Sequence, residues 1–286
     1  MQDYVVVPGF TDWHVHTSLI DGSALAGSAI ARVLDLGANP ETISSVKTGE
    51  GDPQLLYAGA FLTAPGGYPS DRSWATTGSW RFVETLSDAH THVKEMADCG
   101  ACVIKVALNS SAGPVLSDEL LLKIVTSARA HKLPVVVHAE GIGQAARARR
   151  AGAQYLAHTP FSEKLSDLEI KKQANQMTWI STLDIHGWGE PDENFFVAID
   201  NLSRFAAGGG LVLYGSDMGN GPTATGLNMR EIAALQKAGL TEEQIIRALT
   251  GPAPGIAGEL STLQTAIPGV PGQLDFAKAK PHPGEK

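Results

Sequence analysis

The sequence is poor in basic residues, aromatic residues and cysteine. It has 22 Lys and Arg against 30 Asp and Glu, a formal net charge of −8, and aromatic residues make up only 6% of its 286 positions. Nucleic acids and anionic membranes bind through basic patches, so the charge balance argues against both as partners. The two cysteines, Cys99 and Cys102, form a Cys-x-x-Cys without the second pair that a structural zinc site needs. We therefore expect the thiols of Cys99 and Cys102 to be inert, with no redox or metal-binding role.

Long apolar runs and a targeting segment are also missing. No stretch approaches the roughly 18 consecutive apolar residues of a membrane span. No basic stretch followed by an apolar run and a small-residue cleavage site opens the chain. We therefore expect a cytoplasmic protein that acts on a small-molecule substrate. Assembly into a homo-oligomer is compatible with the sequence.

Short apolar runs alternate with amphipathic helical patterns over residues 1–250. Continuous runs such as 135–137 and 211–214 are typical of parallel strands buried on both faces. The alternation predicts an α/β protein, a single-domain (β/α)8 TIM barrel. A doubly wound sheet is less favoured, because no Gly-x-Gly-x-x-Gly follows the first strand. The expected strands are Gly9–Val15, Thr42–Lys47 (the weakest), Gln54–Phe61, Ala101–Ala107, Leu133–Ala139, Gln154–His158, Met177–Leu183 and Leu211–Ser216.

Two segments lack this alternation. Residues 63–80 are rich in Gly, Pro, Ser and Thr and predict a long loop over the active-site face of the barrel. Residues 251–286 predict an irregular surface tail that ends in disorder over 278–286.

Metal-ligating residues follow the strands. His14 and His16 lie two residues apart at the end of the first strand, so both imidazoles point to the same side. Four further candidates each end or follow an apolar run, and a parallel barrel gathers such positions on one face. The pattern predicts a metal centre at the barrel mouth, built from His14, His16, Lys105, His138, His158 and Asp217.

Lys105 lies inside an apolar strand, where a charged ammonium group is costly. Burial next to cationic metals lowers the pKa of an amine and favours its free form. A free amine can add carbon dioxide to give a carbamate, whose oxygens could bridge two metal ions. The expected cofactors therefore include carbon dioxide or bicarbonate.

The set resembles the amidohydrolase superfamily, in particular its imidazolonepropionase-like and prolidase-like branch. The residues that carry the likeness are 7–16 (VPGFTDWHVH), 64–68 (APGGY), Ile104-Lys105, 138–141 (HAEG), Ala157-His158 and 215–217 (GSD). The resemblance implies two divalent ions, most often zinc, one held by His14, His16 and Asp217 and the other by His138 and His158. Carbamylated Lys105 and a hydroxide would bridge them, and Asp217 would move the proton.

The same resemblance implies hydrolysis of an amide-like C–N bond, as in an amide, lactam, cyclic imide or N-acyl amino acid. A lactonase or ester hydrolase, a non-hydrolytic decarboxylase or isomerase, and an inactive metal-binding scaffold are the alternatives. The chain departs from the family pattern in two ways: Tyr68 replaces the last residue of a Gly-Gly-His loop, and most of a small β-sandwich is absent, with residues 267–275 similar to a remnant of it.

Three residues near the predicted mouth are candidate substrate contacts: Tyr68, His186 and Trp188. His90 and His92 repeat the His-x-His spacing but lie in a helical pattern. On a helix two residues two positions apart point about 200° apart, so these two are not expected to share a metal ion.

Overall fold

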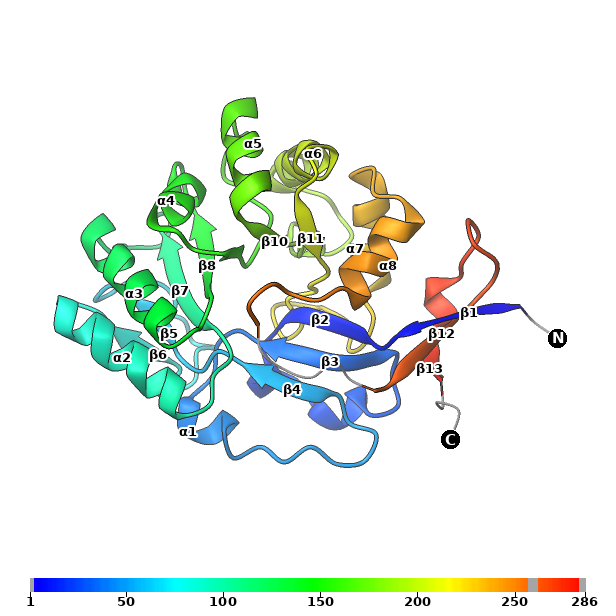
Figure 1. Ribbon diagram of the computed structural model, residues 1–286, viewed down its shortest axis with the longest axis horizontal. Helices are drawn as coiled ribbons and strands as arrows, with labels where there is room; N and C mark the ends of the chain where they lie inside the picture. Colours follow the sequence, from blue (N-terminus) through cyan, green and yellow to red (C-terminus); the bar gives the residue numbers. More distant parts are fainter. Residues whose placement is uncertain (1–2, 257–261, 283–286) are drawn as a thin grey trace.

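The computed structural model describes residues 3–256 and 262–282. Its largest element is a seven-stranded, all-parallel sheet in the order β11-β10-β9-β8-β7-β5-β6 (Figure 1). This confirms the expected α/β class with a parallel sheet. Its strands are β5 (Phe61–Thr63), β6 (Trp80–Phe82), β7 (Ile104–Asn109), β8 (Val135–Glu140), β9 (Tyr155–Leu156), β10 (Thr178–Ile180) and β11 (Leu211–Leu213).

A second parallel sheet contains β2 (Phe10–Val15), β3 (Ile30–Asp35) and β4 (Gln54–Tyr57). Backbone hydrogen bonds connect it to the larger sheet on both sides. Trp13 N–H donates to Tyr214 O at 3.0 Å, and Cys102 N–H donates to Tyr57 O at 3.0 Å. The ladder is interrupted at these two places, so the strands do not form one closed sheet, although their order is consistent with the expected barrel.

The longer helices surround the strands (Figure 1). Two of them begin with a capping box, at Thr85 and Thr241, in which side chains satisfy the first free N–H groups of the helix. Among the described residues, no helix is both long and apolar enough to cross a bilayer. The helices are α2 (Leu86–Asp98), α3 (Asp118–Ala130), α4 (Gln144–Ala151), α5 (Asp167–Gln176), α6 (Glu193–Ala207), α7 (Met229–Lys237) and α8 (Glu242–Thr250).

Two apolar layers hold this arrangement. The larger lies between the strands and the surrounding helices. The smaller collects side chains from strands of both parallel sheets. Its members include Trp13, Leu34, Leu56, Val103, Val136, Tyr155, Ile180 and Leu213. The polar residues of the site lie further along the same strands, toward their carboxyl ends.

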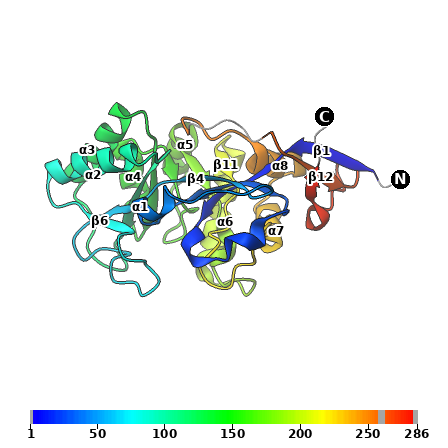
Figure 2. The ribbon, with the colours of Figure 1, turned by 90° about the horizontal axis from the view of Figure 1, so that it is seen from below.

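The outer face of β2-β3-β4 has little helical cover. Between β2 and β3 the chain forms only the short 3-10 turns η1 (Thr17–Leu19) and η2 (Gly22–Leu25), and between β3 and β4 only α1 (Pro40–Ile43). Figure 2 shows the dark blue segment between β2 and β3 beneath the strands. The expected strand over Thr42–Lys47 is wrong, because Asn39 caps a helical turn that Pro40 begins.

Residues beyond 250 are not irregular throughout. Gln264–Pro268 forms β12 and Lys280–His282 forms β13, separated by the 3-10 turn η4 (Phe276–Lys278). These strands build a three-stranded antiparallel sheet with β1 (Tyr4–Pro8), in the order β1-β12-β13. The expectation of an irregular tail is therefore wrong for β12 and β13, because each finds a backbone partner. The expected disorder over 278–286 is wrong for Lys280–His282, which form β13, and its part at 283–286 lies outside the described residues.

Candidate metal centre

Three buried side chains converge at the carboxyl end of β2. His14 lies in that strand, His16 directly follows it, and Asp217 follows β11. The Nε2 atoms of His14 and His16 lie 3.2 and 3.3 Å from Asp217 Oδ1, and the three ligand atoms lie within 4.8 Å of one another. All three residues are at most 6% exposed. Two imidazole nitrogens and a carboxylate oxygen are a ligand set that suits zinc and related divalent ions.

Hydrogen bonds behind this group fix which atoms face inward. His14 Nδ1 lies 2.8 Å from the carbonyl oxygen of Ala157, to which it donates, so Nε2 keeps its lone pair. Asn220 Nδ2 donates to Asp217 Oδ2 at 2.7 Å, and Asp217 Oδ1 has no hydrogen-bond partner in the structure. A buried carboxylate oxygen without a donor is costly unless a cation faces it, so these residues fit a divalent metal ion.

His138 and His158 lie next to this group, as the sequence predicts. The ring of His158 is 4.7 Å from that of His14 and 4.8 Å from that of His138, measured between centroids. His158 Nδ1 is 2.8 Å from Thr182 Oγ1, so its Nε2 is not engaged there. Both rings are buried. These two imidazoles could hold a second ion beside the first.

Lys105 is the sixth predicted ligand, and it is 1% exposed on β7. Its Nζ lies 5.6 Å from the ring centroid of Phe61. Burial lowers the pKa of its ammonium group to about 7, although the nearby Asp217 and Asp35 carboxylates act in the opposite direction. A substantial fraction of the side chain is therefore the neutral amine near neutral pH, as carbamate formation requires.

The charge states of the other groups also suit metal binding. Burial lowers the pKa of His14 and His158 well below the ordinary value, so both imidazoles are neutral and can act as ligands. Burial opposes ionisation of Asp217, yet the adjacent His14 and His16 hold its pKa well below the ordinary value. His14 and His158 are thus neutral imidazoles and Asp217 is an ionised carboxylate, the forms that bind a cation.

The loop over residues 63–80 covers part of the centre, as predicted from its composition. Tyr68 stacks on His138 with ring centroids 4.8 Å apart, and Trp74 lies 5.9 Å from the ring of His16. Both line a pocket of about 110 Å3 together with His16, Leu19, His158, Asp217 and residues 219–221. Tyr68 is therefore placed where a substrate bound at the centre would meet it.

The other two candidate contacts lie near the same face. His186 follows the 3-10 turn η3 (Leu183–Ile185), packs on Phe161 at 4.3 Å between ring centroids, and has a buried Nε2 without a hydrogen-bond partner. Trp188 is 37% exposed and packs so tightly on Gly221 that a Cβ there would lie 2.5 Å from the indole. His90 and His92 lie on α2, as expected, and His92 contacts Glu95.

Three polar residues that support the site were not identified from the sequence. Asp12, Asn109 and Glu140 lie two or four residues from His14, Lys105 and His138 respectively, on the same side of their strands. Asp12 is completely buried and accepts hydrogen bonds from His14 and Ser216. The period-two spacing from each predicted ligand is the signal that could have revealed them.

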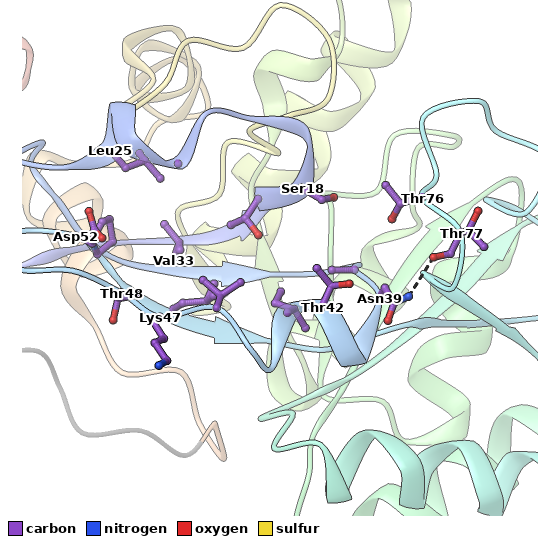
Figure 3. Close-up of a pocket in the computed structure, with 17 residues that line it drawn as sticks. Ser18, Leu25, Val33, Asn39, Thr42, Lys47, Thr48, Asp52, Thr76 and Thr77 are labelled. Carbon is purple, nitrogen blue, oxygen red and sulfur yellow. Dashed lines mark hydrogen bonds between the residues drawn. The ribbon is translucent and has the colours of Figure 1, made fainter.

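A larger pocket, of about 520 Å3, lies away from the metal ligands on the outer face of β2-β3-β4 (Figure 3). Leu25, Val33 and Leu55 contribute apolar surface, and Asn39 and Thr77 are joined by a hydrogen bond at one end. Its lining contains no histidine and no cysteine. Size alone would favour this pocket as a binding site, but the metal-ligating chemistry is concentrated in the smaller one.

No protein-family model and no curated protein matches this sequence. Solved structures do match. A Xaa-Pro dipeptidase with methionine bound in its active site aligns with a TM-score of 0.73 at 17% identity, over 94% of this chain and 82% of that chain. The ochratoxinase of A. niger gives 0.74 at 16%, over 92% and 77%, and an amidohydrolase gives 0.70 at 18%, over 94% and 81%. The resemblance to prolidase-like amidohydrolases is thus confirmed at the level of the fold.

Proposed function

We propose that this chain is a metal-dependent hydrolase of the amidohydrolase type that cleaves an amide-like C–N bond. The observation that carries the proposal is the buried group of His14, His16 and Asp217, whose three ligand atoms lie within 4.8 Å of one another. The fold shared with the Xaa-Pro dipeptidase and the amidohydrolase supports the hydrolytic reaction class. The partner is a small-molecule substrate with an amide, lactam, cyclic imide or N-acyl amino acid bond.

The proposal treats the two parallel sheets as one functional barrel. Seven of its strands alternate with helices, and hydrogen bonds from Trp13 to Tyr214 and from Cys102 to Tyr57 connect the interrupted edges. We therefore assign residues 1–250 to a (β/α)8 hydrolase barrel. In such a barrel catalytic groups gather at the carboxyl ends of the strands, which is where the ligand set lies.

In the proposed enzyme, His14, His16 and Asp217 hold one divalent ion, and His138 and His158 hold the other, with zinc expected at both positions. Lys105, as a carbamate, would supply oxygen ligands to these ions. Bound ions of this kind supply a hydroxide near neutral pH and polarise the scissile carbonyl. Asp217 accepts the proton released during attack and returns it to the leaving nitrogen. Tyr68, His186 and Trp188 contact the substrate.

The decisive experiment combines elemental analysis with a turnover screen. Purified protein is expected to contain two zinc-like ions per chain, and its activity should disappear with a chelator and return with zinc. The screen compares cyclic amides, N-acyl amino acids, dipeptides and lactones. Protein without any bound metal would refute the proposal. Turnover confined to lactones would mean that the enzyme cleaves an ester bond and not a C–N bond.

A further inference from the structure

His138 is held by two polar residues that no part of the proposed function uses. Strands β7 and β8 run parallel with Ala107 opposite His138 and Asn109 opposite Glu140. Positions 107 and 109 lie on the same side of β7, as 138 and 140 do on β8. His138, Glu140 and Asn109 are therefore consecutive inward positions at the carboxyl end of two paired strands, and Ala107 leaves room beside the imidazole.

One carboxylate oxygen connects the three side chains. Glu140 Oε2 lies 3.2 Å from His138 Nε2 and accepts a hydrogen bond from Asn109 Nδ2 at 2.7 Å. The imidazole is 7% exposed and Asn109 is 4% exposed, whereas the Glu140 side chain is 27% exposed, so both partners of the carboxylate are buried while the carboxylate itself is partly open to water. Charge-assisted hydrogen bonds of this kind are stronger than neutral ones, and they are directional.

The orientation of the Asn109 amide is itself fixed. Its Oδ1 accepts from the backbone N–H groups of Ser111 and Ala112, at 3.1 and 3.0 Å. The oxygen therefore faces the turn after β7, and the NH2 group must face Glu140. Exchange of the two amide atoms would break three hydrogen bonds, so Asn109 acts as a fixed donor that holds the carboxylate in place.

The contact determines which nitrogen of His138 is free. An imidazole that donates Nε2–H to Glu140 keeps its lone pair on Nδ1. His14 and His158 are arranged the other way, because their Nδ1 atoms face Ala157 O and Thr182 Oγ1. Without Glu140 nothing in the described contacts would select this tautomer of His138, whose other close neighbours are the rings of Tyr68 and His158.

We propose that Asn109 and Glu140 are positioning residues that fix His138 as a ligand through Nδ1, and that they thereby determine occupancy of the second metal position. This inference rests on the proposed function, since it assumes that His138 binds an ion. Loss of an outer carboxylate partner of a metal-bound histidine costs about 10–100-fold in metal affinity. The effect should fall on the ion held by His138 and spare the ion held by His14, His16 and Asp217.

The test measures zinc binding rather than activity. Wild type, Glu140→Ala, Glu140→Gln and Asn109→Ala are stripped, reloaded with zinc and titrated against a competing chelator. In Glu140→Ala we expect one of the two ions to bind about 10–100-fold more weakly. Asn109→Ala should give a smaller loss, and Glu140→Gln should recover part of the affinity, because an amide oxygen can still accept from His138. Glu163→Ala is the matched control, since Glu163 is a half-buried acid whose carboxylate accepts from the backbone N–H of Gly143 and not from a histidine.

A second measurement needs no metal. In stripped protein labelled with 15N-histidine, the His138 signals, identified with a His138→Asn variant, are expected to show the proton on Nε2. Glu140→Ala should shift the proton toward Nδ1. The inference would be overturned if Glu140→Ala bound both zinc ions as tightly as wild type and kept the same His138 tautomer. It would also be overturned if both ions were weakened equally, or if Glu163→Ala lost the same zinc affinity. A wild-type protein that binds no second ion but shows the expected tautomer would instead refute the binuclear part of the proposed function.

Discussion

The carboxyl group of Asp12 accepts two hydrogen bonds from Ser216, from its hydroxyl at 2.5 Å and from its backbone N–H at 3.0 Å. The same carboxyl also accepts the backbone N–H of His14 at 3.1 Å. One buried side chain thus ties the strand that carries both histidines to the residue before Asp217. The two halves of the first ligand group, 200 residues apart in the sequence, are held in register by this contact.

Asp12→Ala should destabilise the protein strongly. The substitution leaves three buried donors without an acceptor, each costing about 1–3 kcal/mol, so the free energy of unfolding is expected to fall by about 3 kcal/mol or more. Denaturant unfolding of the metal-free protein measures the loss. Ser216→Ala removes one donor and leaves the other two bonds in place, so its cost should be only about 1 kcal/mol. Equal losses in the two variants would contradict the central position of Asp12.

Asp217→Asn should separate metal binding from turnover. The amide oxygen can still face the ion and Asn220 can reorient, so metal content should be retained. The amide cannot accept the proton released during attack, so the turnover number should fall by about 10²–10⁴-fold. Elemental analysis and a kinetic assay on the same preparation give both quantities. Full activity in this variant would remove Asp217 from the proton transfer.

Lys105 should carry a carbamate under ordinary atmospheric carbon dioxide. Protein exchanged into 13C-bicarbonate is expected to show a carbamate carbon signal that Lys105→Ala lacks. The alanine variant should also lose most of its metal and its activity. His90→Ala on the exposed face of α2 serves as a control for the effect of substitution itself. Unchanged activity of Lys105→Ala, with or without bicarbonate, would exclude the proposed role.

Acid should destabilise the metal-free protein through His186. Burial lowers the pKa of His186 from 6.5 to about 4. As the pH falls below 6.5, the unfolded chain binds this proton before the folded chain does, so stability is lost between pH 6.5 and about 4. The difference corresponds to about 3 kcal/mol.

The acid effect can be isolated by substitution. His186→Asn should flatten the dependence of unfolding free energy on pH within this window, whereas His90→Asn should leave it unchanged. Asp12 and Glu231 act in the opposite sense, because burial raises their pKa values to about 7 and 8, so only the difference between variants is diagnostic. An identical slope for wild type and His186→Asn would show that His186 is not buried as a neutral imidazole.

The sequence indicated candidate ligands because metal chemistry restricts residue type and the strand period restricts position, and the structure brings three of them, His14, His16 and Asp217, within 4.8 Å of one another. His14, His16 and Asp217 needed only an apolar run and the rule that parallel strands end on one face. The residues around them were harder to predict. Asn109 and Glu140 are ordinary surface residue types, and the register between β7 and β8 brings them together so that Asn109 donates to Glu140.

Long-range pairing explains where the fold prediction failed. β3 was overlooked because Arg32 and Asp35 interrupt its apolar pattern, although both are buried in the structure. The Arg32 guanidinium lies over the ring of Trp13 at 4.8 Å and donates to Thr11, partners that only the folded chain provides. β12 and β13 were likewise taken as irregular, because a short segment with prolines becomes a strand only when another strand is available.

The pairing of β1 with β12 has a consequence for synthesis of the protein. Thr265 of β12 contacts both Phe10 N at the start of β2 and Ala29 O before β3, across 255 and 236 residues. Because Thr265 follows Phe10 by 255 residues, β2 leaves the ribosomal exit tunnel well before the strand that contacts its first residue has been made. The start of β2 therefore gains this contact only after β12 has been made, and loss of residues 264–268 would loosen the strand that leads to His14 and His16.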